Sequence, residues 1–121
     1  MSKIDPYILS LLEDIYTSAE RIADRLQNET LECFTSQTST DMQDMVARRM
    51  TIMGEAASRL LKKYPEFSEQ HPDIALHQAR RMRNALVHDY NRVDWNLVWK
   101  TIHTELPQLM DAIGPFLSKK R

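Results

Sequence analysis

Four side chains that could bind a phosphate and move a proton lie within eight residues of this chain, at Arg83, Asn84, His88 and Tyr90. A guanidinium group can hold two phosphate oxygens at once, and an imidazole exchanges protons near neutral pH. Two further arginines, Arg80 and Arg81, precede them and could contact the same anion. The segment therefore offers phosphate binding, proton transfer and oxyanion stabilisation without a metal ion.

This segment belongs to a predicted helix, about residues 73–88, whose apolar stripe is Ala75, Ala79, Met82 and Leu86. Because each residue advances about 100° round a helix, the side away from this stripe carries Arg80, Arg83, Asn84 and His88. Asn84 and His88 are four residues apart, so the amide could hydrogen-bond to the imidazole. The apolar Val87 lies among these polar residues, which indicates that a neighbour covers this side. We therefore expect a two-fold dimer whose cleft brings two Arg83/His88 pairs together.

A long amphipathic helix is predicted over about residues 5–27. Asp5 and Pro6 are typical of a helix start, as N-cap and first helical residue. Apolar residues then recur at spacings of three and four, at Ile4, Ile8, Leu11, Leu12, Ile15, Ala19, Ile22, Ala23 and Leu26. Residues 28–39 are polar and predict a loop, with or without one helical turn, whose anchors in the core are Leu31, Cys33 and Phe34.

A second long helix is predicted to begin at a capping box of Thr40 and Gln43 and to end before Pro65. Gly54 lies in its middle, where glycine costs about 1 kcal/mol relative to alanine. A glycine there favours a close contact with another helix. Glu55 is expected near the core stripe, where it could pair with an arginine of residues 73–88, and we favour a structural role for it.

The same helix is rich in methionine, which fits the core first and an adaptable interface second. A last helical region is predicted after Asp94, which is a plausible N-cap. Pro107 either kinks that region or restarts it. Its inward residues are expected to be Trp95, Val98, Ile102, Leu106, Leu109, Ile113 and Phe116.

Composition limits the fold class and the kinds of partner. The 121 residues predict one domain, over residues 1–121, of the all-α class, because good helix formers dominate and only two glycines occur. We expect a small antiparallel bundle of four to five helices. The net charge of −1 excludes a generally basic nucleic-acid binder. Any RNA contact must therefore rest on a local patch, and no DNA binding is expected.

No metal ion, cofactor or membrane is expected as a partner. Cys33 is the only cysteine, which excludes an internal disulfide and fits a reducing compartment. No zinc-ligand spacing joins it to His71, His77 or His103. The chain begins without a signal-peptide core, and no apolar run approaches the length of a membrane span. A cytoplasmic protein is therefore expected.

The stretch Arg83-Asn84-Ala85-Leu86-Val87-His88-Asp89-Tyr90 resembles the motif of the HEPN superfamily of small helical ribonucleases. It is most similar to the HepT toxins, whose motif is Arg, four residues, His, one residue and Tyr. Gly54-Glu55-Ala56 and Asp94-Trp95-Asn96-Leu97-Val98-Trp99 are similar to further segments of that branch. The resemblance covers about residues 40–117.

The resemblance implies a helical homodimer, or a higher even oligomer, that cleaves RNA without a metal. His88 would be the acid/base, Arg83 the phosphate binder and Asn84 the support, with Arg80 and Arg81 as possible RNA contacts. The substrate could be tRNA or mRNA. The resemblance also implies a minimal nucleotidyltransferase antitoxin, which would silence the toxin by attaching AMP to Tyr90.

Other interpretations of the same residues remain open. An arginine and a histidine on one helix are often surface residues, and Tyr90 could simply pack at the helix end. The alternative function is a non-catalytic helical module that binds a nucleotide or a nucleotidyltransferase partner. Loss of RNA cleavage on replacing His88 would separate the two hypotheses.

Overall fold

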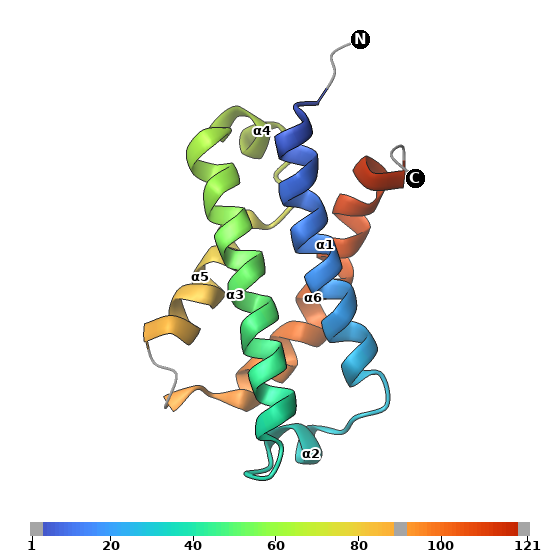
Figure 1. Cartoon of the computed structure of the whole chain (residues 1–121), viewed down its shortest axis with the longest axis vertical. Helices are drawn as coiled ribbons and strands as arrows, with labels where there is room; N and C mark the ends of the chain where they lie inside the picture. Colours follow the sequence, from blue (N-terminus) through green and yellow to red (C-terminus); the bar gives the residue numbers. More distant parts are fainter. Residues whose placement is uncertain (1–3, 89–91, 119–121) are drawn as a thin grey trace.

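The computed structural model describes residues 4–88 and 92–118, which form an all-α bundle as predicted (Figure 1). The described part contains six helices: α1 (Pro6–Leu26), α2 (Leu31–Thr35), α3 (Thr40–Lys63), α4 (Pro65–Gln70), α5 (Leu76–His88) and α6 (Trp95–Ser118). Four of them are long and run alternately up and down, whereas α2 and α4 are single short turns. Helix α3 lies between α1 and α5, and α6 packs against α1.

Helix α1 begins and ends within one residue of the prediction. The side chain of Asp5 accepts a hydrogen bond of 2.8 Å from the backbone N–H of Tyr7, which confirms the N-cap. The predicted stripe is buried except at its edges, because Ile4 and Ala23 are exposed. Ile4 precedes the helix, and Ala23 is turned about 100° from its buried neighbour Ile22.

The connection between α1 and α3 contains one helical turn, α2, and only one of its three predicted anchors is buried. Phe34 is 0% exposed and its ring lies 5.7 Å from that of Trp95 and 5.4 Å from that of Trp99. Leu31 and Cys33 are exposed, so the prediction was wrong for them. A five-residue helix presents one narrow face to its neighbour, and α2 uses that face for Phe34.

The predicted capping box at the start of α3 was wrong. The N-cap is Ser39, whose side chain makes no capping bond, and Thr40 is already helical. The side chain of Gln43 is buried, and its Nε2 donates to the carbonyl of Phe34 at 2.8 Å and of Ser36 at 3.3 Å. Buried carbonyls need donors, so Gln43 holds the α2–α3 turn and is not free for the cap.

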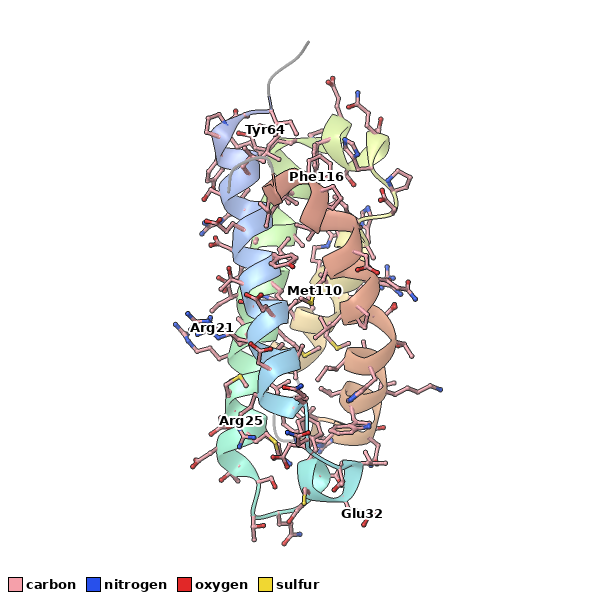
Figure 2. All side chains as sticks on the ribbon, turned by 90° about the vertical axis from the view of Figure 1, so that its right-hand side faces the viewer. Arg21, Arg25, Glu32, Tyr64, Met110 and Phe116 are labelled. Carbon is pink, nitrogen blue, oxygen red and sulfur yellow. The ribbon has the colours of Figure 1, made fainter. Side chains whose placement is uncertain are left out.

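Helix α3 ends where expected, before Pro65, with Lys62 and Lys63 in its last turn. The Oη of Tyr64, the residue after α3, donates a hydrogen bond of 3.0 Å to the Asp5 carboxylate. This bond ties the start of α1 to the end of α3, at the end of the molecule opposite Glu32 of α2 (Figure 2).

Helix α5 begins at Leu76, three residues later than predicted. Ile74 is buried in the preceding turn, whose geometry is fixed by a 2.7 Å hydrogen bond from the N–H of Leu76 to the carbonyl of Ile74. The expected stripe faces the protein interior, with Leu86 buried and Ala75, Ala79 and Met82 partly buried.

Helix α6 runs without a break through Pro107 and Pro115, so neither proline restarts it. Asp94 caps it, since Oδ1 accepts a hydrogen bond of 3.2 Å from the N–H of Leu97. The predicted inward residues are buried except Trp95 and Phe116, which are partly exposed. Within residues 4–88 and 92–118, no helix has both the length and the apolar character of a membrane span.

Candidate functional site

The candidate site lies where α5 crosses the middle of α3. A Cβ atom placed on Gly54 would lie 2.1 Å from Cβ and 2.6 Å from Cγ of Arg83, and 3.0 Å from the carbonyl oxygen of Ala79. Real Cβ atoms do not approach other carbons this closely, so only glycine allows the two helices to pack here. The close contact predicted at Gly54 is therefore confirmed, and its partner is the stem of Arg83.

Arg83 consequently points toward α3, and the prediction that it faces away from the core was wrong. Its side chain is 31% exposed. The prediction rested on the apolar stripe of α5 alone. Helix α3 packs on the flank of that stripe and also contacts the aliphatic part of Arg83. Arginine can bury its methylene groups along a neighbouring helix while its charged end reaches toward water.

The guanidinium of Arg83 is held by two partners. Nη1 donates a hydrogen bond of 2.8 Å to Oδ1 of Asn84, the next residue. Nη2 lies 4.0 Å from Oε1 of Glu55 on α3, which is an ion pair without a hydrogen bond. Nε is buried and has no hydrogen-bond partner among the described residues. Nη2 therefore carries most of the donor hydrogens that a phosphate could still use.

Glu55 lies at the edge of the α3–α5 contact. Its side chain is 50% exposed, so the prediction that it sits near the core stripe was wrong. The glycine before it occupies the contact, and Glu55 is turned about 100° further toward solvent. The expected ion pair with an arginine of the motif helix is confirmed.

Asn84 is half-buried and supports Arg83 directly. His88 is the last residue of α5, and its side chain lies outside what the structure describes, as does all of Tyr90. The hydrogen bond between Asn84 and His88, and the roles of His88 and Tyr90, therefore remain predictions. The structure brings Arg83, Asn84 and Glu55 together, which are three residues from two helices.

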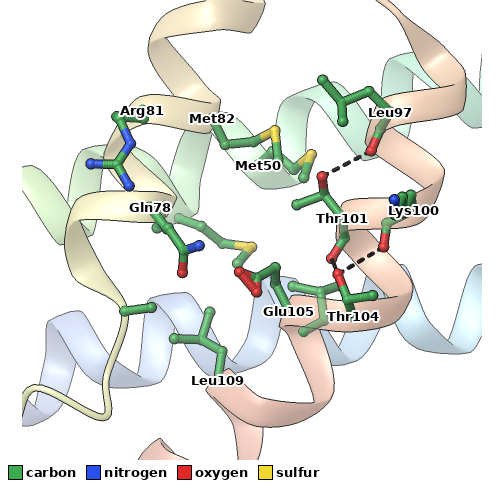
Figure 3. A pocket seen from close by; sticks show the side chains of 14 residues that line it. Met50, Gln78, Arg81, Met82, Leu97, Lys100, Thr101, Thr104, Glu105 and Leu109 are labelled. Carbon is green, nitrogen blue, oxygen red and sulfur yellow. Dashed lines mark hydrogen bonds between the residues drawn. The ribbon is translucent and has the colours of Figure 1, made fainter.

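A groove of about 490 Å³ lies beside the motif helix, between α5 and α6, with α3 as its floor (Figure 3). Its walls are mainly apolar and include Met50, Met53 and Met82. The charged residues that line it are Arg81 of α5 and Lys100 and Glu105 of α6.

Of the two arginines before the motif, Arg81 is exposed and Arg80 is half-buried. Sequence reasoning did not find the groove or Lys100. The methionine-rich pattern of α3 was the one available signal, because methionine suits surfaces that adapt to a partner.

Comparisons with known proteins agree with the motif. A family model described as "Ribonuclease HepT-like" matches residues 15–115. The protein named "Putative RNase TTE0752", from Caldanaerobacter subterraneus subsp. tengcongensis, is 29% identical over 110 residues, which are 91% of this chain and 94% of that protein. The protein named "Probable ribonuclease HepT", from Thermococcus cleftensis, is 34% identical over 98 residues, covering 81% of this chain and 84% of that protein.

No solved structure matches the chain. The family match spans most of the chain, including all of α3 and α5 and therefore Gly54, Glu55, Arg83 and Asn84. This chain belongs to the HepT-like family of the HEPN superfamily.

Proposed function

We propose that this protein is a HepT-like toxin that cleaves RNA as a metal-independent endoribonuclease. The observation that carries the proposal is the way in which Arg83, a residue of the family motif, is held by its neighbours. Its guanidinium is bonded to Asn84 at 2.8 Å, stands 4.0 Å from Glu55, and lies on the helix that ends at His88. An arginine held in one place without a full set of partners is suited to bind a phosphate.

In the proposed reaction, His88 takes the proton of the ribose 2′-hydroxyl, and the 2′-oxygen attacks the neighbouring phosphorus. Arg83 stabilises the negative charge that builds on the phosphoryl oxygens, and Asn84 keeps the guanidinium in place. The bond from phosphorus to the 5′-oxygen breaks, and that oxygen receives a proton. The products are a 2′,3′-cyclic phosphate and a 5′-hydroxyl end, so neither water nor a metal is consumed in this step.

We propose that the acting species is a homodimer or a higher even oligomer. A second copy would supply a second His88, which could protonate the leaving 5′-oxygen. The apolar groove between α5 and α6 is a surface that another copy could cover, since methionine-lined surfaces adapt to a partner. Arg80 and Arg81 would then contact RNA near the cleft.

We further propose control by a minimal nucleotidyltransferase antitoxin that attaches AMP to Tyr90. Tyr90 follows the last residue of α5 by two positions. An added AMP there would bring bulk and negative charge to the proposed phosphate site, which opposes the entry of a phosphate.

The test is a cleavage assay on unmodified protein in the presence of EDTA, with analysis of the product ends. We expect cyclic-phosphate ends from the wild type and a loss of about 10²- to 10⁴-fold in His88→Ala, the range that general acid–base groups contribute. His77→Ala is the matched control, because His77 is an exposed histidine on the same helix. Dependence on divalent metal, or products with 5′-phosphates, would contradict the mechanism.

The groove favours one alternative function, a non-catalytic module that binds a nucleotide or a nucleotidyltransferase. Its volume of about 490 Å³ lies in the range of small-molecule sites, and its lining includes two cationic residues and one carboxylate, that of Glu105. If the unmodified wild type never cleaves RNA yet binds such a partner, this alternative replaces the enzyme.

A further inference from the structure

Two glycines occur in the chain, and both lie inside long helices with very different surroundings. A Cβ on Gly114 of α6 would meet only Cε2 of Tyr16, at 3.9 Å, an ordinary contact. A Cβ on Gly54 would meet atoms close to the backbone of Arg83, and also the carbonyl of Ala79. The long end of a side chain can move aside, but here α5 itself would have to move away from α3.

Two arginine–glutamate ion pairs occur among the described residues, and they also differ in setting. Arg25, in the last turn of α1, and Glu29, three residues beyond the end of α1, lie 3.2 Å apart. Arg83 and Glu55 lie 4.0 Å apart on two different helices, and the Nε of the same guanidinium is buried. The second pair joins two helices, whereas the first joins two side chains that are close together in the sequence.

The distance of 4.0 Å has a chemical consequence. At this range the Glu55 carboxylate attracts the guanidinium but does not take up the N–H groups of Nη2. The hydrogen bond from Nη1 to Asn84 fixes one corner of the group, and the attraction to Glu55 fixes its rotation. An incoming phosphate can therefore use Nη2 without first displacing a hydrogen-bonded carboxylate.

We propose that Gly54 and Glu55 of α3 are positioning residues for Arg83, Gly54 by letting its stem lie against α3 and Glu55 by orienting its guanidinium for the phosphate. The inference rests on the proposed ribonuclease function, which it deepens. It assigns the adjacent pair on α3 a role in the reaction through Arg83, with no contact to RNA required of either residue.

The orienting role predicts a specific kinetic effect for Glu55→Gln. The change keeps the size of the side chain but removes the charge that directs the guanidinium. We expect kcat to fall about ten- to a hundredfold, in keeping with the sensitivity of catalysis to misplaced groups. KM should stay the same or fall, because a negative charge near the phosphate is lost. Glu29→Gln is the matched control and should change neither constant.

A double-mutant cycle tests whether Glu55 acts through Arg83. In an Arg83→Ala background, Glu55→Gln should lower the residual cleavage rate no further. An independent loss of rate in that background would overturn the inference, as would a wild-type kcat in the single variant Glu55→Gln.

The seating role of Gly54 is tested by folding stability, which does not depend on activity. We expect Gly54→Ala to lower the midpoint of urea unfolding and to remove cleavage, while Gly114→Ala leaves both unchanged or raises the midpoint. A Gly54→Ala protein with wild-type midpoint and wild-type kcat would overturn the seating role.

The two proposals fail in different ways. If the wild type does not cleave RNA, the proposed function fails and the positioning role falls with it, whatever the unfolding midpoints are. If the wild type cleaves RNA and Glu55→Gln behaves like Glu29→Gln, the ribonuclease function stands and only the inference about Glu55 is overturned.

Discussion

Helix α3 packs against α1 on one side and α5 on the other, and the two sides use different kinds of side chain (Figure 1). On the side of α1, both helices contribute fully buried apolar residues to the core, among them Leu12, Ile15 and Val46. The contact with α5 centres on Gly54 and the stem of Arg83, whose buried Nε has no hydrogen-bond partner in the described part of the chain.

Under the proposed function, one helix serves both folding and chemistry. Each apolar group buried between α1 and α3 stabilises the fold. Toward α5, a glycine costs about 1 kcal/mol in helix propensity, and a buried donor without a partner costs about 1–3 kcal/mol. The protein loses stability on this side and gains a cation in a fixed place, as functional sites commonly do.

The largest effect should come from removing the cation. We expect Arg83→Ala to lower the rate of RNA cleavage about 10²- to 10³-fold, the loss seen when one group that stabilises a developing negative charge is removed. Arg59→Ala, at an exposed position on α3, should leave the rate unchanged. Initial cleavage rates at saturating RNA measure both variants. Full activity in Arg83→Ala would show that the contact between α3 and α5 has no role in cleavage.

On the other side of α3, Leu12→Ala should lower the free energy of unfolding by about 2–5 kcal/mol, because it leaves a cavity in the core. Cleavage per folded molecule should not change. Urea unfolding combined with a rate measurement well below the transition checks both parts. A large rate loss in fully folded Leu12→Ala would show that the two sides of α3 are not separate.

Gln43 is a buried polar residue of α3 for which we expect a structural role alone, so replacing it should change stability and not the cleavage rate. Gln43→Met keeps the approximate volume but takes the donor from the carbonyls of Phe34 and Ser36. The lost hydrogen bonds should cost about 1–3 kcal/mol of stability, with no effect on kcat. Thermal unfolding and cleavage rates measure the two quantities. An unchanged stability or a lowered kcat would contradict the prediction.

The smallest effect concerns pH at the far end of α3. Partial desolvation, with the hydrogen bond to Asp5 and its negative charge, raises the pKa of Tyr64 above the ordinary 10.0. A raised pKa stabilises the fold while the phenol is protonated in both states, and this contribution is lost as the pH rises past 10.0.

The wild type should therefore lose slightly more stability than Tyr64→Phe between neutral pH and pH above 10.0. Parallel urea titrations of the two proteins measure the difference. Identical pH dependence would show that the Tyr64–Asp5 bond contributes nothing to folding.

Local signals in the sequence were sufficient for most of the helices. Asp5 and Asp94 are N-caps as predicted, and the apolar spacing placed nearly all of the buried stripes of α1 and α6. Gly54 was also interpreted correctly, because a glycine inside a helix needs a packing reason. The caps and the stripes depend on residues within a few positions of each other, and the glycine signals a contact without naming its partner.

The errors at Gln43 and Arg83 arose because the surroundings of each side chain include another part of the chain. Gln43 matched a capping box, but the carbonyls of the α2–α3 turn take its amide. Arg83 was placed on the outer face of its helix, because the periodicity of α5 does not reveal where α3 will pack. The groove between α5 and α6 could not be predicted for the same reason, since three helices form it.

Tryptophan and tyrosine rings at opposite ends of the molecule give two fluorescence signals that can be followed during unfolding. Trp95 and Trp99 contact Phe34 at the α2 end, whereas the rings of Tyr7 and Tyr64 lie 6.2 Å apart at the opposite end (Figure 2). Tryptophan emission therefore follows the docking of α2 on α6, and two of the four tyrosines report on the junction of α1 and α3. Coincident curves from the two signals would show that both ends melt in one transition, which is the condition for comparing the variants above on a single stability scale.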